Sequence, residues 1–103
     1  ILVRAAGNVH VVRPADIDYV ESQDDYILLH TASGNHRKKQ TLTSLAEQLD
    51  PECFVRVHRC FVVNLDRLDR LEPYSRESRV AVLHDGTRIP VSRSGYARLR
   101  ERL

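Results

Sequence analysis

At 103 residues the chain is long enough for one domain with a modest hydrophobic core. No apolar run approaches the roughly 18 residues of a membrane helix, and the N-terminus has no basic region followed by an apolar stretch, so we expect a soluble cytoplasmic protein. The net charge of +2 is too small to identify a polyanionic partner by itself, and because Ile1 is not a natural start, we expect a piece excised from a longer protein.

Apolar and polar residues alternate with a period of two along most of the chain, which predicts β-strands. The first predicted element is a hairpin within residues 1–13 that turns at Gly7-Asn8. Strands at 17–22 and 26–31 follow, separated by a polar loop. The turn Ser33-Gly34-Asn35 then leads to a basic edge strand at 36–40.

One short helix is predicted at residues 42–49, where three leucines share a helical face. Either Thr41 or Thr43 can cap its start, and Asp50-Pro51 ends it. The segments predicted after this helix are, in order, paired strands within 54–64, a hairpin of 68–74 and 79–84, a short strand at 87–91, and a terminal helix.

The terminal helix is predicted to begin at Ser92, a residue type that caps helices. Its apolar side chains Tyr96, Leu99 and Leu103 share one face, which we expect to pack inward. Because there are no repeats, linkers or low-complexity tracts, we expect a single domain over residues 1–103. The predicted fold class is mostly β, with short antiparallel sheets, one short helix in mid-chain and a C-terminal helix.

Arginine strongly outnumbers lysine among the 16 basic residues. Arginine favours bidentate contacts with phosphate and guanine, although a GC-rich genome produces the same bias. The basic residues cluster at 36–39, around Arg56 and Arg59, and from Arg93 to Arg102, while the acids lie mostly elsewhere. The local potential can therefore be positive although the total charge is small. Arg56 remains ambiguous, because it fits equally a role in supporting the fold through a carboxylate.

His58 and Arg59 lie at a corner between two apolar strands, directly before Phe61–Asn64. An arginine at a corner of a rigid β scaffold can reach a guanine edge or a phosphate at little cost in ordering entropy. A solvated turn without a ligand explains the same residues equally well.

The sequence gives little support for a catalytic site or a metal site. Asp24 and Asp25 are adjacent and point to different faces, no glycine-rich phosphate loop is present, and the histidines lack HExxH spacing. Cys53, His58 and Cys60 have no fourth ligand at a structural zinc spacing. We therefore expect neither an enzyme nor a metal or other cofactor. A module that binds a protein partner by strand addition remains an alternative, and it would lack the steep salt dependence of DNA binding.

The segment Phe54–Leu65 closely resembles the signature of the LytTR DNA-binding domain, which is found mainly in bacterial response regulators. Cys60 is the one departure inside this signature: the family usually has serine there, so a local hydrogen bond should weaken and a possible oxidation site arises. Three further stretches fit the family in order and spacing, and together they cover about Val9 to Leu103: Ile17–Ser22 followed by Asp25-Tyr26, then Thr41-Leu42, then Asp85-Gly86-Thr87 leading to Pro90–Arg93.

The resemblance implies an elongated domain whose loops, and no recognition helix, enter successive major grooves on one side of bent double-stranded DNA. The implied base-reading residues are Arg59 beside His58, Arg93, and the loop residue Asp25 or Tyr26, while Lys39 would contact a phosphate or the groove edge. The neighbouring Asp24 would repel phosphates unless it accepted from cytosine or held an arginine. The resemblance also implies transcription regulation, direct-repeat half-sites bound by two copies, and an upstream receiver domain. The apolar residues, 42% of the chain, are spread over short alternating strands, and a domain this small needs nearly all of them for its own core, so we expect a monomer without DNA.

Overall fold

Strands make up most of the regular structure in the computed structural model, which describes residues 1–103. The helices are α1 (Leu42–Gln48) and α2 (Arg93–Arg100), and two short 3-10 turns are η1 (Pro14–Asp16) and η2 (Leu65–Arg67). The strands are β1 (Leu2–Ala5), β2 (Asn8–Val11), β3 (Ile17–Gln23), β4 (Tyr26–Thr31), β5 (Gly34–Lys39), β6 (Phe54–His58), β7 (Phe61–Asn64), β8 (Leu68–Pro73), β9 (Arg79–Leu83) and β10 (Arg88–Val91).

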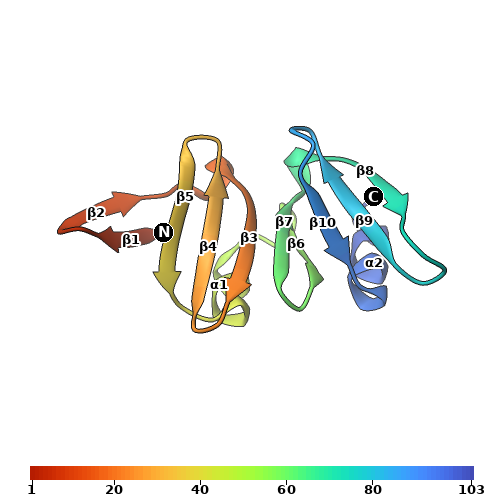
Figure 1. The fold of residues 1–103 in the computed structure, drawn as a ribbon, viewed down its shortest axis with the longest axis horizontal. Coiled ribbons are helices and arrows are strands. Elements are labelled where there is room, and N and C mark those ends of the chain that lie inside the picture. The colour runs from red at the N-terminus through yellow and green to blue at the C-terminus, as the bar shows by residue number, and fades with distance from the viewer.

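These strands form three antiparallel sheets laid out along the long axis of the molecule (Figure 1). The N-terminal hairpin is β1-β2, the central sheet has the order β5-β4-β3-β7-β6, and the third sheet has the order β10-β9-β8. The molecule measures 47 × 24 × 22 Å along its principal axes. The predicted mostly β, elongated fold is therefore confirmed. Neither α-helix is long and apolar enough to cross a membrane.

The central sheet is covered on both faces, which creates two separate hydrophobic cores. On one face, Val20 and Val62 pack with the three leucines of the α1 segment. On the other face, Val57 and Val63 pack with the third sheet and with Leu99 of α2. Successive residues of β7 thus face different cores, which explains why this strand is a continuous apolar run. The corner between β6 and β7 is consequently anchored in buried strands.

Both helices begin at the predicted capping residues. Thr41 Oγ1 accepts a hydrogen bond from the Ser44 amide at 3.0 Å, so Thr41 and not Thr43 caps α1. Ser92 Oγ accepts from the Gly95 amide at 3.0 Å at the start of α2. These bonds satisfy one of the amides that a helix leaves free in its first turn.

Three predicted boundaries differ from the structure. The first hairpin turns at Ala6-Gly7, one residue early, because Ala5 pairs with Asn8 and both turn residues adopt positive φ angles (51° and 81°). The β4–β5 turn also shifts, because Thr31 pairs with Gly34 and β5 therefore begins at Gly34. The expectation that Leu103 packs inward is wrong: α2 ends at Arg100, and the Leu103 side chain is 73% exposed.

Candidate nucleic-acid interface

Four chain turns from distant parts of the sequence lie along one long edge of the molecule, the lower edge in Figure 1. In the central sheet β3, β5 and β6 run in the same direction, so their C-terminal ends reach the same edge. The start of α2 joins them, because the Ser92 amide donates to the Val57 carbonyl at 2.9 Å. We call this side the turn edge. Its segments are residues 23–26, 39–41, 58–61 and 92–95.

The first part of the turn edge combines the β3–β4 turn with the end of β5. Strand pairing places Tyr26 directly opposite Lys39, so these two predicted contact residues are brought together. The Arg37 guanidinium stacks over the Tyr26 ring at 3.9 Å, which holds the ring in place. Asp25 and Lys39 are exposed, and no hydrogen bond or ion pair involves either side chain. Asp24 adopts φ 53°, a left-handed conformation that aspartate tolerates.

The β6–β7 corner occupies the middle of the turn edge. The Cys60 amide donates to His58 Nδ1 at 3.0 Å, so the neutral His58 ring carries its proton on Nε2. Burial, followed by the positive charge of Arg59, lowers the pKa of His58 below its ordinary value of 6.5. The Ser22 amide donates to the Cys60 carbonyl at 2.9 Å, which ties the corner to β3. The Arg59 side chain is exposed and makes no ion pair.

Arg56, which the sequence leaves ambiguous, joins this corner to α1 and supports the fold through neutral acceptors and not through a carboxylate. Its guanidinium donates to Thr43 Oγ1 at 2.8 Å and to the Arg59 carbonyl at 2.7 Å. Both acceptors are neutral, so the charge of Arg56 is held in a fixed position without being neutralised. The sequence could not show this arrangement, because Thr43 lies 13 residues away in the first turn of a separate helix.

The start of α2 packs against β6 unusually closely. A Cβ atom on Gly95 would overlap the Val57 carbonyl, so only glycine fits this position. The Arg98 guanidinium donates to the Arg56 carbonyl at 3.0 Å, again a neutral acceptor. Arg93 is exposed and faces Glu77 at 4.0 Å, at the outer limit for an ion pair between two solvated side chains. Arg93 therefore lies beside the corner but does not join it.

A cleft of about 310 Å³ lies between the β6–β7 corner and the start of α2. We call it the basic cleft. None of the protein's ion pairs includes Arg56, Arg59 or Arg98. Ser94 and Arg98 are not among the predicted contact residues, although their i, i+4 spacing places them on one helical face. The residues that line the cleft are all polar, and none is acidic: Arg56, His58, Arg59, Ser92, Ser94 and Arg98.

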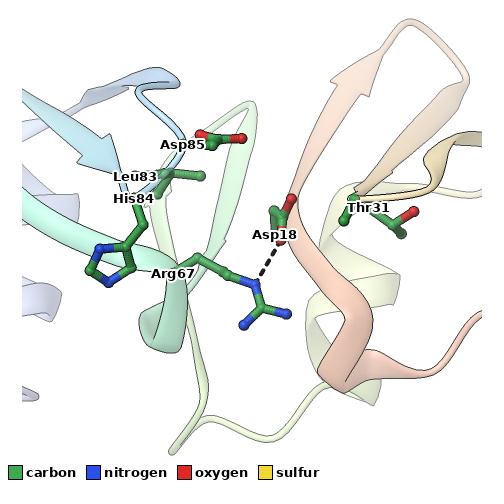
Figure 2. A pocket seen from close by; sticks show the side chains of 7 residues that line it. Asp18, Thr31, Arg67, Leu83, His84 and Asp85 are labelled. Atoms are coloured by element: carbon green, nitrogen blue, oxygen red, sulfur yellow. Dashed lines mark hydrogen bonds and ion pairs between the residues drawn. The ribbon is translucent and has the colours of Figure 1, made fainter.

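The opposite edge of the molecule differs in charge. A hollow of about 460 Å³ lies there between the central and third sheets. Figure 2 shows Arg67 reaching from η2 toward Asp18, whose Oδ1 accepts from Arg67 Nε at 2.8 Å. Asp85 contributes a second carboxylate to the lining, and hydrogen bonds from Thr87 lower its pKa. With two carboxylates and one neutralised arginine, this hollow is poorly suited to phosphate.

Comparison with known proteins identifies the family. The model of the LytTr DNA-binding domain matches residues 7–103. The chain is 31% identical over 91 residues to the sensory transduction protein LytT of Bacillus subtilis (strain 168), which covers 88% of this chain and 37% of that protein. It is 30% identical over 87 residues to the transcriptional regulatory protein YpdB of Escherichia coli (strain K12), which covers 84% of this chain and 36% of that protein. The chain thus spans little more than a third of the length of these relatives.

The fold has a solved counterpart. The LytTr DNA-binding domain of a Bacillus cereus protein described as a methyl-accepting/DNA response regulator superposes with a TM-score of 0.88 at 22% identity. The match covers 98% of this chain and 93% of that one. With a family model that matches nearly all of its residues, the chain belongs to the LytTr DNA-binding domain family.

Proposed function

We propose that the turn edge is the surface that binds double-stranded DNA, with its turns entering successive major grooves. The observation that carries the proposal is the convergence of four turns on one edge whose basic side chains, apart from Arg93, are free of acidic partners. A free basic side chain can neutralise a phosphate or donate to a guanine edge without first breaking an ion pair. The opposite edge, with its carboxylates, lacks this property.

The dimensions of the molecule agree with this mode of binding. The turn edge runs parallel to the long axis, which measures 47 Å (Figure 1). One turn of B-DNA is about 34 Å long, so successive major grooves on one side of the duplex are about that far apart. The edge is thus long enough for turns near its two ends to reach two grooves.

We assign separate roles to the side chains of the turn edge. Arg59, supported by His58, and Arg93 are suited to base readout, because an arginine guanidinium donates in pairs to guanine O6 and N7. Asp25 or Tyr26 would read a base from the first turn, where a carboxylate can accept from cytosine N4. Lys39, opposite Tyr26, would contact a phosphate or the groove edge.

The longer protein would regulate transcription in the cytoplasm as a response regulator with an upstream receiver domain. The names of its relatives, a sensory transduction protein and a transcriptional regulatory protein, support this role. Two copies would bind direct-repeat half-sites, and the receiver domain would raise the local concentration of a neighbouring copy.

The chain itself should be a monomer without DNA. Nearly all apolar residues are expected in the core, but Leu2, Val9 and Val11 lie exposed on one face of the β1-β2 hairpin. Three side chains are too few for a stable dimer, whose interface buries about 1,200 Å² or more. Sedimentation at micromolar concentrations should therefore give the monomer mass. A concentration-independent dimer would contradict this expectation.

A selection of binding sites from random duplex DNA, repeated at two salt concentrations, tests the proposed function. A DNA-binding edge should enrich a defined sequence, and its affinity for random duplex should fall steeply with salt through counterion release. The absence of an enriched sequence together with a salt-independent affinity would contradict the proposal and favour a protein-interaction module.

A further inference from the structure

The basic cleft concentrates positive charge that the folded chain does not neutralise. Arg56 and Arg98 each donate to a neutral oxygen, and Arg59 has no partner at all. Like charges held close together repel one another unless an anion lies between them. A cluster of guanidinium groups without carboxylates is therefore suited to hold an anion.

The start of α2 adds to the positive potential of the cleft. The first turn of a helix leaves backbone amides without partners, and the helix dipole favours an anion there. Ser92 Oγ satisfies the Gly95 amide, while Ser94 contributes a hydroxyl to the lining. The close packing of Gly95 on Val57 fixes the start of the helix against the corner. Side chains that carry three kinds of donor thus line the cleft: guanidinium, hydroxyl and imidazole.

On these grounds we propose that the basic cleft binds one phosphodiester group of the DNA backbone, with Arg56, Arg98 and Ser94 as its donors. The inference rests on the proposed function of the turn edge and adds a position at which the duplex is fixed. A phosphate in the cleft would lie between the β6–β7 corner and the start of α2, close to Arg59, which also lines the cleft. The site takes an isolated phosphate group, so inorganic phosphate shares its chemistry.

The contact with a phosphate in the cleft should be independent of base sequence. A phosphate group is the same at every nucleotide, and contacts to it fix the register of a protein on the duplex without reading bases. Arg98 should therefore contribute equally to cognate and random DNA. Arg100, on the same helix, stacks near the Tyr96 ring and does not line the cleft, so it provides a matched control.

The first experiment measures the affinities of wild type, Arg98→Ala and Arg100→Ala for a selected duplex and for random duplex at several salt concentrations. A lost charge-assisted hydrogen bond corresponds to roughly 10-fold weaker binding or more. Arg98→Ala should bind both duplexes about 10-fold more weakly than wild type, and the dependence of its affinity on salt should have a slope lower by about 1. Arg100→Ala should lose less than about twofold. Equal effects of the two substitutions would overturn the assignment of the cleft.

The second experiment removes the charge from the DNA, so the measurement on the wild type does not depend on how well a variant folds. Methylphosphonate groups replace single phosphates along the selected duplex. At one position the replacement should weaken the wild type about 10-fold and Arg98→Ala less than about twofold, because the partner charge is already absent. If every position weakens both proteins equally, no phosphate lies in the cleft.

Inorganic phosphate separates the two sources of the ligand. Titration of the chain, followed by amide chemical shifts of residues 92–95, should show saturable binding only at millimolar concentrations or above, because a single phosphate lacks the neighbouring contacts of a duplex. Micromolar affinity for free phosphate would overturn the proposal that the ligand of the cleft is a phosphodiester group of the DNA backbone. If Arg98→Ala binds all DNA like wild type while Arg59→Ala loses the selected site, the cleft proposal fails and the proposed function stands. If no protein binds DNA in a salt-dependent manner, the proposed function itself fails.

Discussion

Gly95 in α2 lies directly against the Val57 carbonyl of β6, with no room for a Cβ atom between them. The contact joins two residues that are 38 positions apart in the sequence, and it places the start of α2 beside the β6–β7 corner. The neighbouring bond from the Ser92 amide to the Val57 carbonyl closes the same junction. The position of the basic cleft therefore depends on this junction between α2 and β6.

Gly95→Ala should destabilise the protein despite the better helix propensity of alanine. In an exposed helix this substitution stabilises by about 1 kcal/mol. Here the added methyl group meets backbone, and such overpacking costs roughly 1–3 kcal/mol or more. Denaturant unfolding should give a lower free energy of unfolding, with Ala97→Ser as an exposed control on the same helix. A Gly95→Ala variant more stable than wild type would contradict the close approach.

Arg59→Ala should reduce specific DNA binding by roughly 1–3 kcal/mol and relax the preference at one base pair. Stability should change by less than about 0.5 kcal/mol, because the side chain is exposed and only the backbone carbonyl accepts from Arg56. Affinity for the selected duplex and for single-base variants measures both effects. Arg4→Ala, at an exposed position on β1, is the control. Binding of the selected duplex with wild-type affinity would exclude direct readout by Arg59.

Lys39→Ala and Arg93→Ala should differ in their dependence on sequence. Loss of Lys39 removes a phosphate contact, so all duplexes should bind more weakly and the salt slope should fall by about 1. Loss of Arg93 should weaken the selected site more than random DNA. Titrations of both duplexes at several salt concentrations separate these patterns. If both variants lost the same affinity for both duplexes, the two residues would belong to a basic surface that binds any DNA.

His58 should make stability depend on pH. Its pKa is lowered by burial and then by Arg59, so the folded state favours the neutral ring that accepts from the Cys60 amide. As the pH falls, His58 takes up a proton at about pH 6.5 in the unfolded chain and only at a lower pH in the folded chain. The stabilisation from the neutral ring is therefore present above about pH 6.5 and is lost as the pH falls through the pKa of the folded state. His58→Asn keeps an acceptor but does not titrate. The stability advantage of wild type over this variant should shrink on acidification, and a constant difference would contradict the neutral ring.

Local patterns are enough to predict the strands and the cap of α2, and they narrow the cap of α1 to Thr41 or Thr43. Alternation with a period of two reflects one buried face for each strand, and this information lies within five or six residues. The two shifted hairpin turns show the limit: the register of Ala5 with Asn8 and of Thr31 with Gly34 decides where a turn falls. Local patterns cannot predict that Leu103 is exposed, because its position depends on where the last helical turn ends.

The candidate site could be predicted only in part. The corner at His58 and Arg59 stands out because its flanking strands are unusually apolar. Arg98 was missed because its place beside Arg56 arises from the docking of α2 on β6, a contact between residues 42 positions apart. The role of Arg56 stays open in the sequence for the same reason, since its partners lie in α1 and in the backbone of the corner.

Amide chemical shifts recorded while a selected duplex is added to the chain test the location of the DNA most directly. Binding along the turn edge should shift the amides of residues 23–26, 39–41, 58–61 and 92–95, and leave those around Thr31, Arg67 and His84 at the opposite edge unchanged. Shifts concentrated at the opposite edge or on the β1-β2 hairpin, with the four turns unaffected, would contradict the account.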